Sequence, residues 1–133
     1  MTLRQLPFAK IILLRDDIAE VIINESVEMD LDMVDAYHSF LLANLKAPFS
    51  LLINKINPYS YTYEAQKKLG TLEEIKAMAV VAYRRSTKTS TEALAAMPRS
   101  LAWNLRIHSN REDALEWLIA IHEAPPPDSP NSQ

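Results

Sequence analysis

The chain has 133 residues, with 14 lysine and arginine residues against 17 aspartate and glutamate residues, eight prolines, one glycine and no cysteine. This length suits one ordinary domain, which can remove about two-thirds of its unfolded surface from water. The net charge of −3 argues against nucleic acid or an anionic membrane as the default partner. The lack of cysteine excludes disulfide bonds and thiolate metal sites.

Neither end of the chain shows a targeting or membrane segment. The first ten residues lack the apolar run of a signal peptide, and nowhere are there 18 consecutive apolar residues. We therefore expect a cytoplasmic protein with no transmembrane segment. Residues 124–133 include three consecutive prolines and no large apolar residue, which predicts a Pro-rich disordered tail after a single domain over residues 1–123.

The first third of the chain predicts a hairpin and a helix. Two short apolar runs, residues 10–14 and 18–23, flank the polar residues 15–17, a pattern typical of two antiparallel strands. From Asp30 onward, apolar residues recur at three- and four-residue spacing, which predicts an amphipathic helix. Asp30 or Asp32 is expected to cap this helix, and Pro48 to end it.

The middle of the chain alternates strands and helices. Residues 49–54 predict a third strand, and Ser60 or Thr62 is expected to begin a helix that Gly70 stops. Residues 71–75 are interpreted as a further helical turn. Residues 77–83 are apolar at both sets of alternate positions, as in a strand covered on both faces.

The last third completes an α/β order. A helix is expected to begin at Ser90 or Thr91, followed by an edge strand over residues 101–108. A final helix starts near residue 110 and buries a stripe made of Ala114, Leu115, Trp117, Leu118 and Ile121. The order predicts an α/β domain with a mixed, mostly parallel five-stranded sheet, an N-terminal hairpin and about four helices.

This layout resembles the STAS fold of bacterial anti-anti-sigma factors, and more closely the SpoIIAA-like group, also described as STAS/SEC14 domains. The resemblance is carried by the hairpin over residues 10–23 and by residues 107–118, where a strand and a polar turn lead into an Ala-Leu-x-Trp-Leu helix. It covers about residues 8–122. It implies a non-enzymatic module that binds protein partners in the anti-anti-sigma branch, or lipids and other apolar ligands in the SEC14 branch.

The anti-anti-sigma branch carries a phosphorylatable Ser or Thr within an Asp-Ser-Ser/Thr-Gly-like sequence. The matching segment here, residues 57–64, keeps hydroxyls at Ser60 and Thr62 but has neither the acidic residue before them nor the glycine after. Ser60 and Thr62 are therefore the candidate phosphorylation sites that the resemblance implies.

Two clusters are expected to meet at one edge of the sheet, because ligands of open α/β sheets bind outside the carboxyl ends of the strands. The first is a tyrosine-rich segment over residues 54–62, and the second is a cationic segment over residues 84–87. Together they predict a rim that contacts a partner or ligand, with candidate residues Asn54, Asn57, Tyr59, Ser60, Tyr61, Thr62, Arg84, Arg85, Ser86 and Thr87. The alternative is that a hydroxyl only caps a helix, the rings only cover its flank and the charges are only solvated.

Other patterns give weaker indications of function. With Gly70 as the single glycine, no P-loop, dinucleotide-binding loop or nucleophile elbow can exist, so we expect no enzyme, no cofactor and no metal. A small hydrolase using Asp16 or Asp17 with a histidine is the remaining catalytic alternative. A homodimer through the strand of Trp103 or through a helix face is left undecided.

Overall fold

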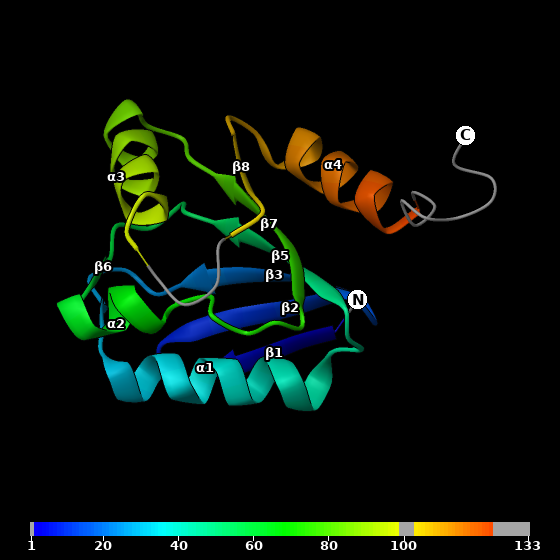
Figure 1. Ribbon diagram of the computed structural model, residues 1–133, viewed down its shortest axis with the longest axis horizontal. Helices are drawn as coiled ribbons and strands as arrows, with labels where there is room; N and C mark the ends of the chain where they lie inside the picture. The colour runs from blue at the N-terminus through cyan, green and yellow to red at the C-terminus, as the bar shows by residue number, and fades with distance from the viewer. Residues whose placement is uncertain (1, 99–102, 124–133) are drawn as a thin grey trace.

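The protein is an α/β domain with a mixed sheet and helices on both of its faces (Figure 1). The computed structural model describes residues 2–98 and 103–123. The strands are β1 (Thr2–Leu6), β2 (Ala9–Arg15), β3 (Ile18–Ile23), β4 (Glu28–Met29), β5 (Phe49–Asn54), β6 (Ser60–Tyr61), β7 (Ile75–Val81) and β8 (Leu105–His108). The helices are α1 (Leu31–Asn44), α2 (Tyr63–Lys68), α3 (Arg85–Ala95) and α4 (Arg111–Glu123).

The main sheet has the strand order β1-β2-β3-β5-β7-β8, and β4 and β6 form a separate two-stranded pair. The β1–β2 and β2–β3 pairings are antiparallel, and the β3–β5, β5–β7 and β7–β8 pairings are parallel. The sheet is mixed, as predicted, but the expectation of five mostly parallel strands is wrong, because the sheet has six strands and two of its five pairings are antiparallel.

The additional strand is β1, which lies at one edge of the sheet. Its residues are mostly exposed, so its sequence has no buried alternation that would mark it as a strand. It is extended because it pairs with β2 over the whole register from Thr2↔Leu13 to Leu6↔Ala9. Pairing with a neighbour, rather than local propensity, decides the state of such a segment.

The hairpin and the first helix are confirmed. β2 and β3 pair antiparallel across the polar turn, and α1 begins where Asp30 accepts a hydrogen bond from the backbone N–H of Met33 at 2.9 Å. Gly70 ends the segment after α2 with a positive φ of 69°, which a residue without Cβ adopts at no steric cost.

Three other boundaries differ from expectation. Residues 71–74 are not helical: they form a single turn, in which Ile75 N–H donates to the Leu72 carbonyl at 3.1 Å, and Ile75 already belongs to β7. Helix α3 begins at Arg85 rather than at Ser90 or Thr91, so the cationic segment is its first turn and not a loop. Thr62, and not Ser60, caps α2, since Thr62 Oγ1 accepts from Ala65 N–H at 3.2 Å.

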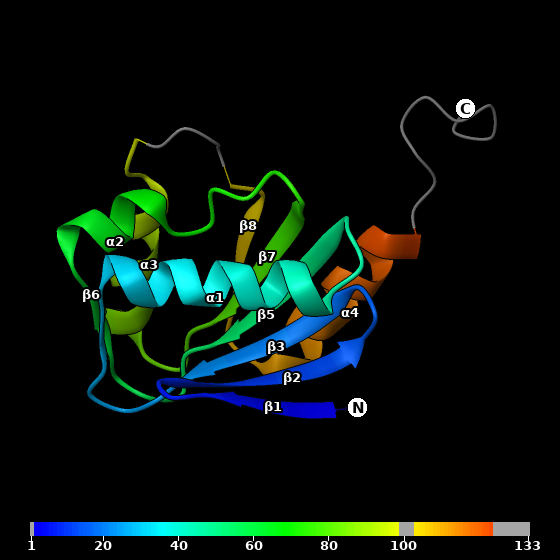
Figure 2. The same cartoon turned by 90° about the horizontal axis from the view of Figure 1, so that it is seen from below.

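Two apolar layers lie on opposite faces of the sheet. The larger layer joins the sheet to α1 and α2 and includes Val34, Leu41, Phe49 and Leu51. The smaller layer joins the other face to α4, through residues such as Leu52, Ala79 and Leu118. Figure 2 shows α1 crossing in front of the sheet and α4 behind it.

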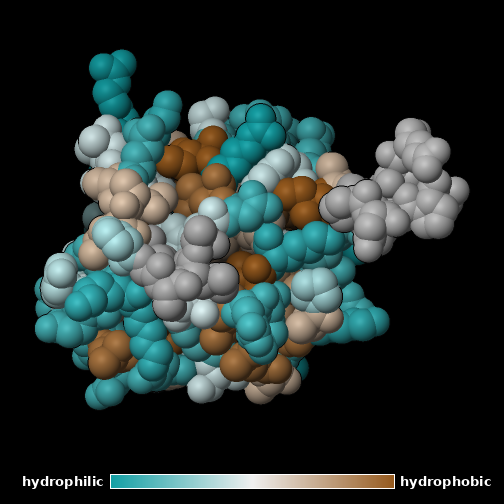
Figure 3. Space-filling model, in the orientation of Figure 1, coloured by the Kyte–Doolittle hydropathy of each residue, from teal (hydrophilic) through white to brown (hydrophobic). Residues whose placement is uncertain are grey.

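The C-terminal part agrees with expectation in outline. β8 is the second edge strand, and α4 begins where Asn110 accepts from Asp113 N–H at 2.9 Å. The predicted tail, residues 124–133, and residues 101–102 of the expected edge strand lie outside the described residues. No helix of the described part is long and apolar enough to cross a membrane. In Figure 3, one face of the molecule is largely hydrophilic, with apolar side chains in small separate patches.

Candidate functional site

The two predicted clusters meet at the carboxyl ends of β5 and β7. β5 leads into the tyrosine-rich segment and β7 into α3, and the two strands are parallel neighbours, so both segments leave the same edge of the sheet. Between them lies a groove with a volume of about 200 Å³. We call it the outer groove. It is lined by Lys55, Asn57, Pro58, Tyr59, Arg84, Ser86, Thr87 and Ser90.

A second hollow extends from this groove into the larger apolar layer. We call this hollow the inner pocket, and its volume is about 40 Å³. It shares Lys55 and Tyr59 with the outer groove, so these two residues form the boundary between them. Its walls are mainly apolar and come from the sheet, from α1 and α3, and from the segments after α2 and before β8, including Leu51, Met78, Val80, Leu69, Leu94 and Trp103.

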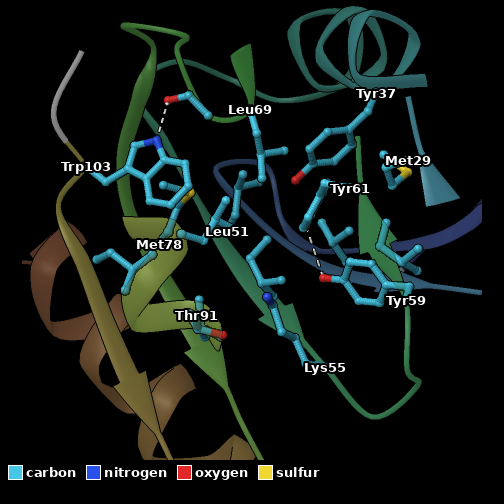
Figure 4. A pocket seen from close by; sticks show the side chains of 17 residues that line it. Met29, Tyr37, Leu51, Lys55, Tyr59, Tyr61, Leu69, Met78, Thr91 and Trp103 are labelled. Carbon is cyan, nitrogen blue, oxygen red and sulfur yellow. Dashed lines mark hydrogen bonds between the residues drawn. The ribbon is translucent and has the colours of Figure 1, made fainter. Parts of the chain in front are cut away.

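Three tyrosines form one side of the inner pocket, opposite Trp103 (Figure 4). The rings of Tyr59 and Tyr61 pack edge to face with centroids 5.4 Å apart, and Tyr61 OH donates to Tyr59 OH at 3.2 Å. Burial raises the pKa of the phenols of Tyr37, Tyr59 and Tyr61 above the ordinary value. For Tyr61 the pKa rises to about 12. The phenols therefore stay protonated at neutral pH and can donate hydrogen bonds.

Lys55 brings a cation to the mouth of this apolar pocket. Its Nζ lies 5.5 Å from the ring centroid of Tyr59 and 5.8 Å from that of Tyr61, within cation–π range. Burial lowers the pKa of Lys55 to about 8. Lys55 forms no ion pair with a carboxylate of the described residues. Figure 4 shows its amine pointing into the pocket, near the hydroxyl of Tyr59.

The opposite wall is fixed by hydrogen bonds around Gly70. Trp103 Nε1 donates to the Gly70 carbonyl at 3.1 Å, and Gly70 N–H donates to His38 Nε2 at 3.2 Å. Because His38 accepts this bond while buried, it is neutral, and burial lowers its pKa to about 4. The indole that lines the pocket is thus held in place through α1.

Of the ten predicted rim residues, five line the outer groove, namely Asn57, Tyr59, Arg84, Ser86 and Thr87, and Tyr61 lines the inner pocket. The other four do not contribute to either hollow. Ser60 is exposed in β6, Thr62 Oγ1 caps α2, and Arg85 is exposed. Asn54 faces the α4 side, where its Nδ2 donates to Glu20 Oε2 at 2.9 Å.

Sequence reasoning missed Lys55, Tyr37, Thr91 and Trp103, all of which line the inner pocket. The position of Lys55 in the pocket could have been predicted from the alternation of side chains along β5. In a strand, alternate residues share a face, so Ile53 and Lys55 point to the pocket side while Asn54 points away. The other three come from separate elements, and no local pattern indicates that they meet.

The hydrolase alternative corresponds to a real contact on the other face of the sheet. Ser50 Oγ lies 2.7 Å from His122 Nε2, and His122 Nδ1 lies 3.1 Å from Asp17 Oδ2. This order of groups matches a Ser-His-Asp triad. Ser50 is 0% exposed, however, and the side chain of His122 is 5% exposed. In this conformation a substrate carbonyl cannot reach the hydroxyl, and the contact fastens the end of α4 to β5.

A second buried contact holds the start of α4. Glu20 on β3 accepts two hydrogen bonds from Arg111 Nε and one from Arg111 Nη2, at 2.9–3.1 Å. The Glu20 side chain is 4% exposed, so it depends on Arg111 for its charge balance. The described residues contain no group of three or more histidine or acidic side chains that could hold a metal ion.

Comparison of the chain with protein-family models, with curated proteins and with solved structures finds no significant match. The site is therefore interpreted from its own geometry.

Proposed function

We propose that the protein is a non-catalytic binding module whose ligand occupies the inner pocket and the outer groove together. One observation carries this proposal: an apolar pocket whose boundary holds Lys55, a cation without an acidic partner among the described residues, beside protonated phenols. Ligand sites are typically concave and apolar, with a few polar groups that fix orientation. A half-buried amine without a counter-ion lowers stability, so its presence favours a binding role.

The size of the pocket favours a small ligand over a whole lipid. A water molecule needs a cavity volume of about 10–15 Å³. An inner pocket of about 40 Å³ therefore has room for about three or four atoms of that size. A carrier of the SEC14 type would need a cavity of about 300 Å³ or more. Long-chain lipids would have to displace the packed core.

The burial of Ser50 supports the non-catalytic part of the proposal. A serine nucleophile must be exposed to its substrate and face an oxyanion site. Ser50 is the second residue of the central strand β5, it is fully buried, and its hydroxyl is hydrogen-bonded to His122.

A protein partner at the same rim is the second candidate, in keeping with the resemblance to SpoIIAA-like domains. It is favoured by large apolar side chains that are exposed on the two segments bordering the groove. Ile56 is 56% exposed and Tyr83 is 47% exposed. A partner that docks there would lose affinity when these two side chains become serine, whereas a ligand in the inner pocket would not.

The proposal is tested with a small apolar probe, 1-pentanol, in a Trp117→Phe variant. The chain has two tryptophans, so this variant leaves Trp103, which lines the inner pocket, as the only indole. Pentanol should change the emission of Trp103 in a saturable manner.

The matched blocked protein is the same variant with Val80→Leu, which adds one methylene at the wall of the pocket. It should melt at a similar temperature and should no longer respond to pentanol. An identical titration in the blocked and open proteins, or no response in either, would contradict the proposal.

A further inference from the structure

We propose that the ligand is a small anionic amphiphile, with an apolar tip of about three or four carbon atoms in the inner pocket and an anionic head between Lys55 and Arg84. This inference rests on the proposed function and assigns a chemical class to its ligand.

The charge of the outer groove selects an anionic head. The basic side chains in its lining are Lys55 and Arg84, and no aspartate or glutamate lines it. Neither cation forms an ion pair with a carboxylate of the described residues. This local excess of positive charge contrasts with a net charge of −3 for the whole chain. An anion would supply the missing counter-charge for both groups.

The neutral groups of the outer groove suit the same head. Ser86 and Thr87 bring two hydroxyls to it, while Asn57 Nδ2 donates to the Ile23 carbonyl at 3.0 Å and Ser90 Oγ donates to the Ser86 carbonyl at 2.9 Å. The hydroxyl of Tyr59, 3.2 Å from that of Tyr61, lies at the boundary of the two hollows. With a volume of about 200 Å³, the groove has room for a carboxylate or a phosphate ester.

The walls of the inner pocket select an apolar tip. Most of its surface comes from aliphatic, methionine and aromatic side chains. Away from the boundary with the outer groove, two of its polar side chains already have partners within the protein: Thr91 Oγ1 donates to the Thr87 carbonyl at 2.8 Å, and the Trp103 indole donates to the Gly70 carbonyl at 3.1 Å. A polar tip would therefore find few free partners and would lose hydration.

Binding of an anion should be linked to a proton. Because burial lowers the pKa of Lys55 to about 8, roughly half of the amines are unprotonated at pH 8 in the free protein. An anion beside the amine favours its charged form, so the protein should take up about half a proton per bound ligand at this pH. A neutral ligand should cause no uptake.

The test compares butyl phosphate, pentanoate and 1-pentanol by isothermal titration calorimetry at pH 8, in two buffers of different ionisation enthalpy. Butyl phosphate and pentanoate share the anionic amphiphile chemistry and distinguish a phosphate ester from a carboxylate. At least one of them should bind about tenfold or more tightly than pentanol, since a charge-assisted hydrogen bond contributes about 1.5–3 kcal/mol. Its heat should depend on the buffer as proton uptake requires.

Three variants complete the test. Lys55→Met and Arg84→Met should each weaken the better anion by about tenfold. Lys55→Met should also abolish the proton uptake that accompanies binding of the anion. Lys10→Met is the matched control, because it removes the same charge from an exposed lysine of β2 that lines neither hollow. It should leave all three affinities unchanged.

The outcomes separate the two proposals. Tighter binding of an anion that depends on Lys55 and Arg84 supports both. Equal binding of pentanol and the two anions, or anion binding that survives both substitutions, would overturn the anionic head and leave the binding pocket standing. If none of the three compounds binds at millimolar concentration, the pocket itself is refuted as a site for small ligands, and the exposed rim remains as a candidate protein interface.

Discussion

Replacing Lys55 with methionine should make the protein more stable while removing its affinity for anions. The two side chains have similar length, so the change keeps the shape of the boundary between the inner pocket and the outer groove. It removes a charge that burial disfavours and that no carboxylate of the described residues offsets.

The size of the effect follows from the pKa of Lys55, which burial lowers from 10.5 to about 8. At 1.36 kcal/mol per pH unit, burying the charged amine costs about 3 kcal/mol. The methionine loses the cation–π contacts with Tyr59 and Tyr61, which contribute about 1 kcal/mol. The variant should therefore gain about 2 kcal/mol in the free energy of unfolding at pH 7, or about 6 °C in melting temperature.

The stability difference between the wild-type protein and Lys55→Met should depend on pH, whereas a difference caused by packing alone should not. The pKa of Lys55 is lower in the folded than in the unfolded protein, so the unfolded protein binds more protons between about pH 8 and 10.5. The wild-type protein therefore gains stability relative to the variant as pH rises through this range. The difference in the free energy of unfolding between the two proteins should have its full value at pH 7 and should be close to zero near pH 10.5.

Urea denaturation at pH 7 and at pH 10 measures this gap, with Lys10→Met as the control. Exposed substitutions of this kind usually change stability by less than about 0.5 kcal/mol. A Lys55→Met protein that is less stable than wild type at pH 7, or a gap that does not change with pH, would refute the reasoning about the buried amine.

Three further substitutions test the supports of the pocket by urea denaturation. Gly70→Ala should lose about 2 kcal/mol, because Gly70 has a φ of 69° and an added Cβ would lie 2.5 Å from Trp103 Nε1; unchanged stability would contradict that contact. The pKa of His38 is about 4 in the folded protein, below the ordinary 6.5, so its contribution is complete above pH 6.5 and is lost as pH falls towards 4. Between these pH values wild type should lose about 3 kcal/mol more than His38→Gln, and parallel pH profiles would argue against a buried neutral imidazole. Arg111→Met should lose about 3 kcal/mol at pH 7 by leaving Glu20 buried without a counter-ion, and the double change with Glu20→Gln should recover most of it; a loss confined to the double variant would contradict the pairing.

Local signals in the sequence predicted several elements correctly. The cap at Asp30, the turn between residues 10–14 and 18–23, and the stop at Gly70 each depend on a few adjacent residues. The meeting of the tyrosine-rich and cationic segments was also predictable, because it follows from two neighbouring parallel strands. In each of these cases, the structure follows from a few adjacent residues or from the direction of neighbouring strands, and no distant side chain is needed to predict it.

Features that depend on distant partners could not be predicted. β1 is a strand because β2 pairs with it, and its own residues have no buried face. The inner pocket requires Tyr37 from α1, Trp103 before β8 and Thr91 from α3 to surround the same space. Asn54 is different: the alternation of β5 already placed it on the face opposite Lys55, so its inclusion in the rim was an avoidable error.

The most direct test of the pocket is a ¹H–¹⁵N correlation spectrum of the wild-type protein, recorded while butyl phosphate is added. The chain contains two indoles, one in the wall of the inner pocket and one on α4 against the other face of the sheet. We predict that the indole N–H signal of Trp103 shifts in a saturable manner while that of Trp117 does not move. A shift of Trp117 alone, or no shift of either signal at millimolar concentration, would contradict the binding pocket proposed for this protein.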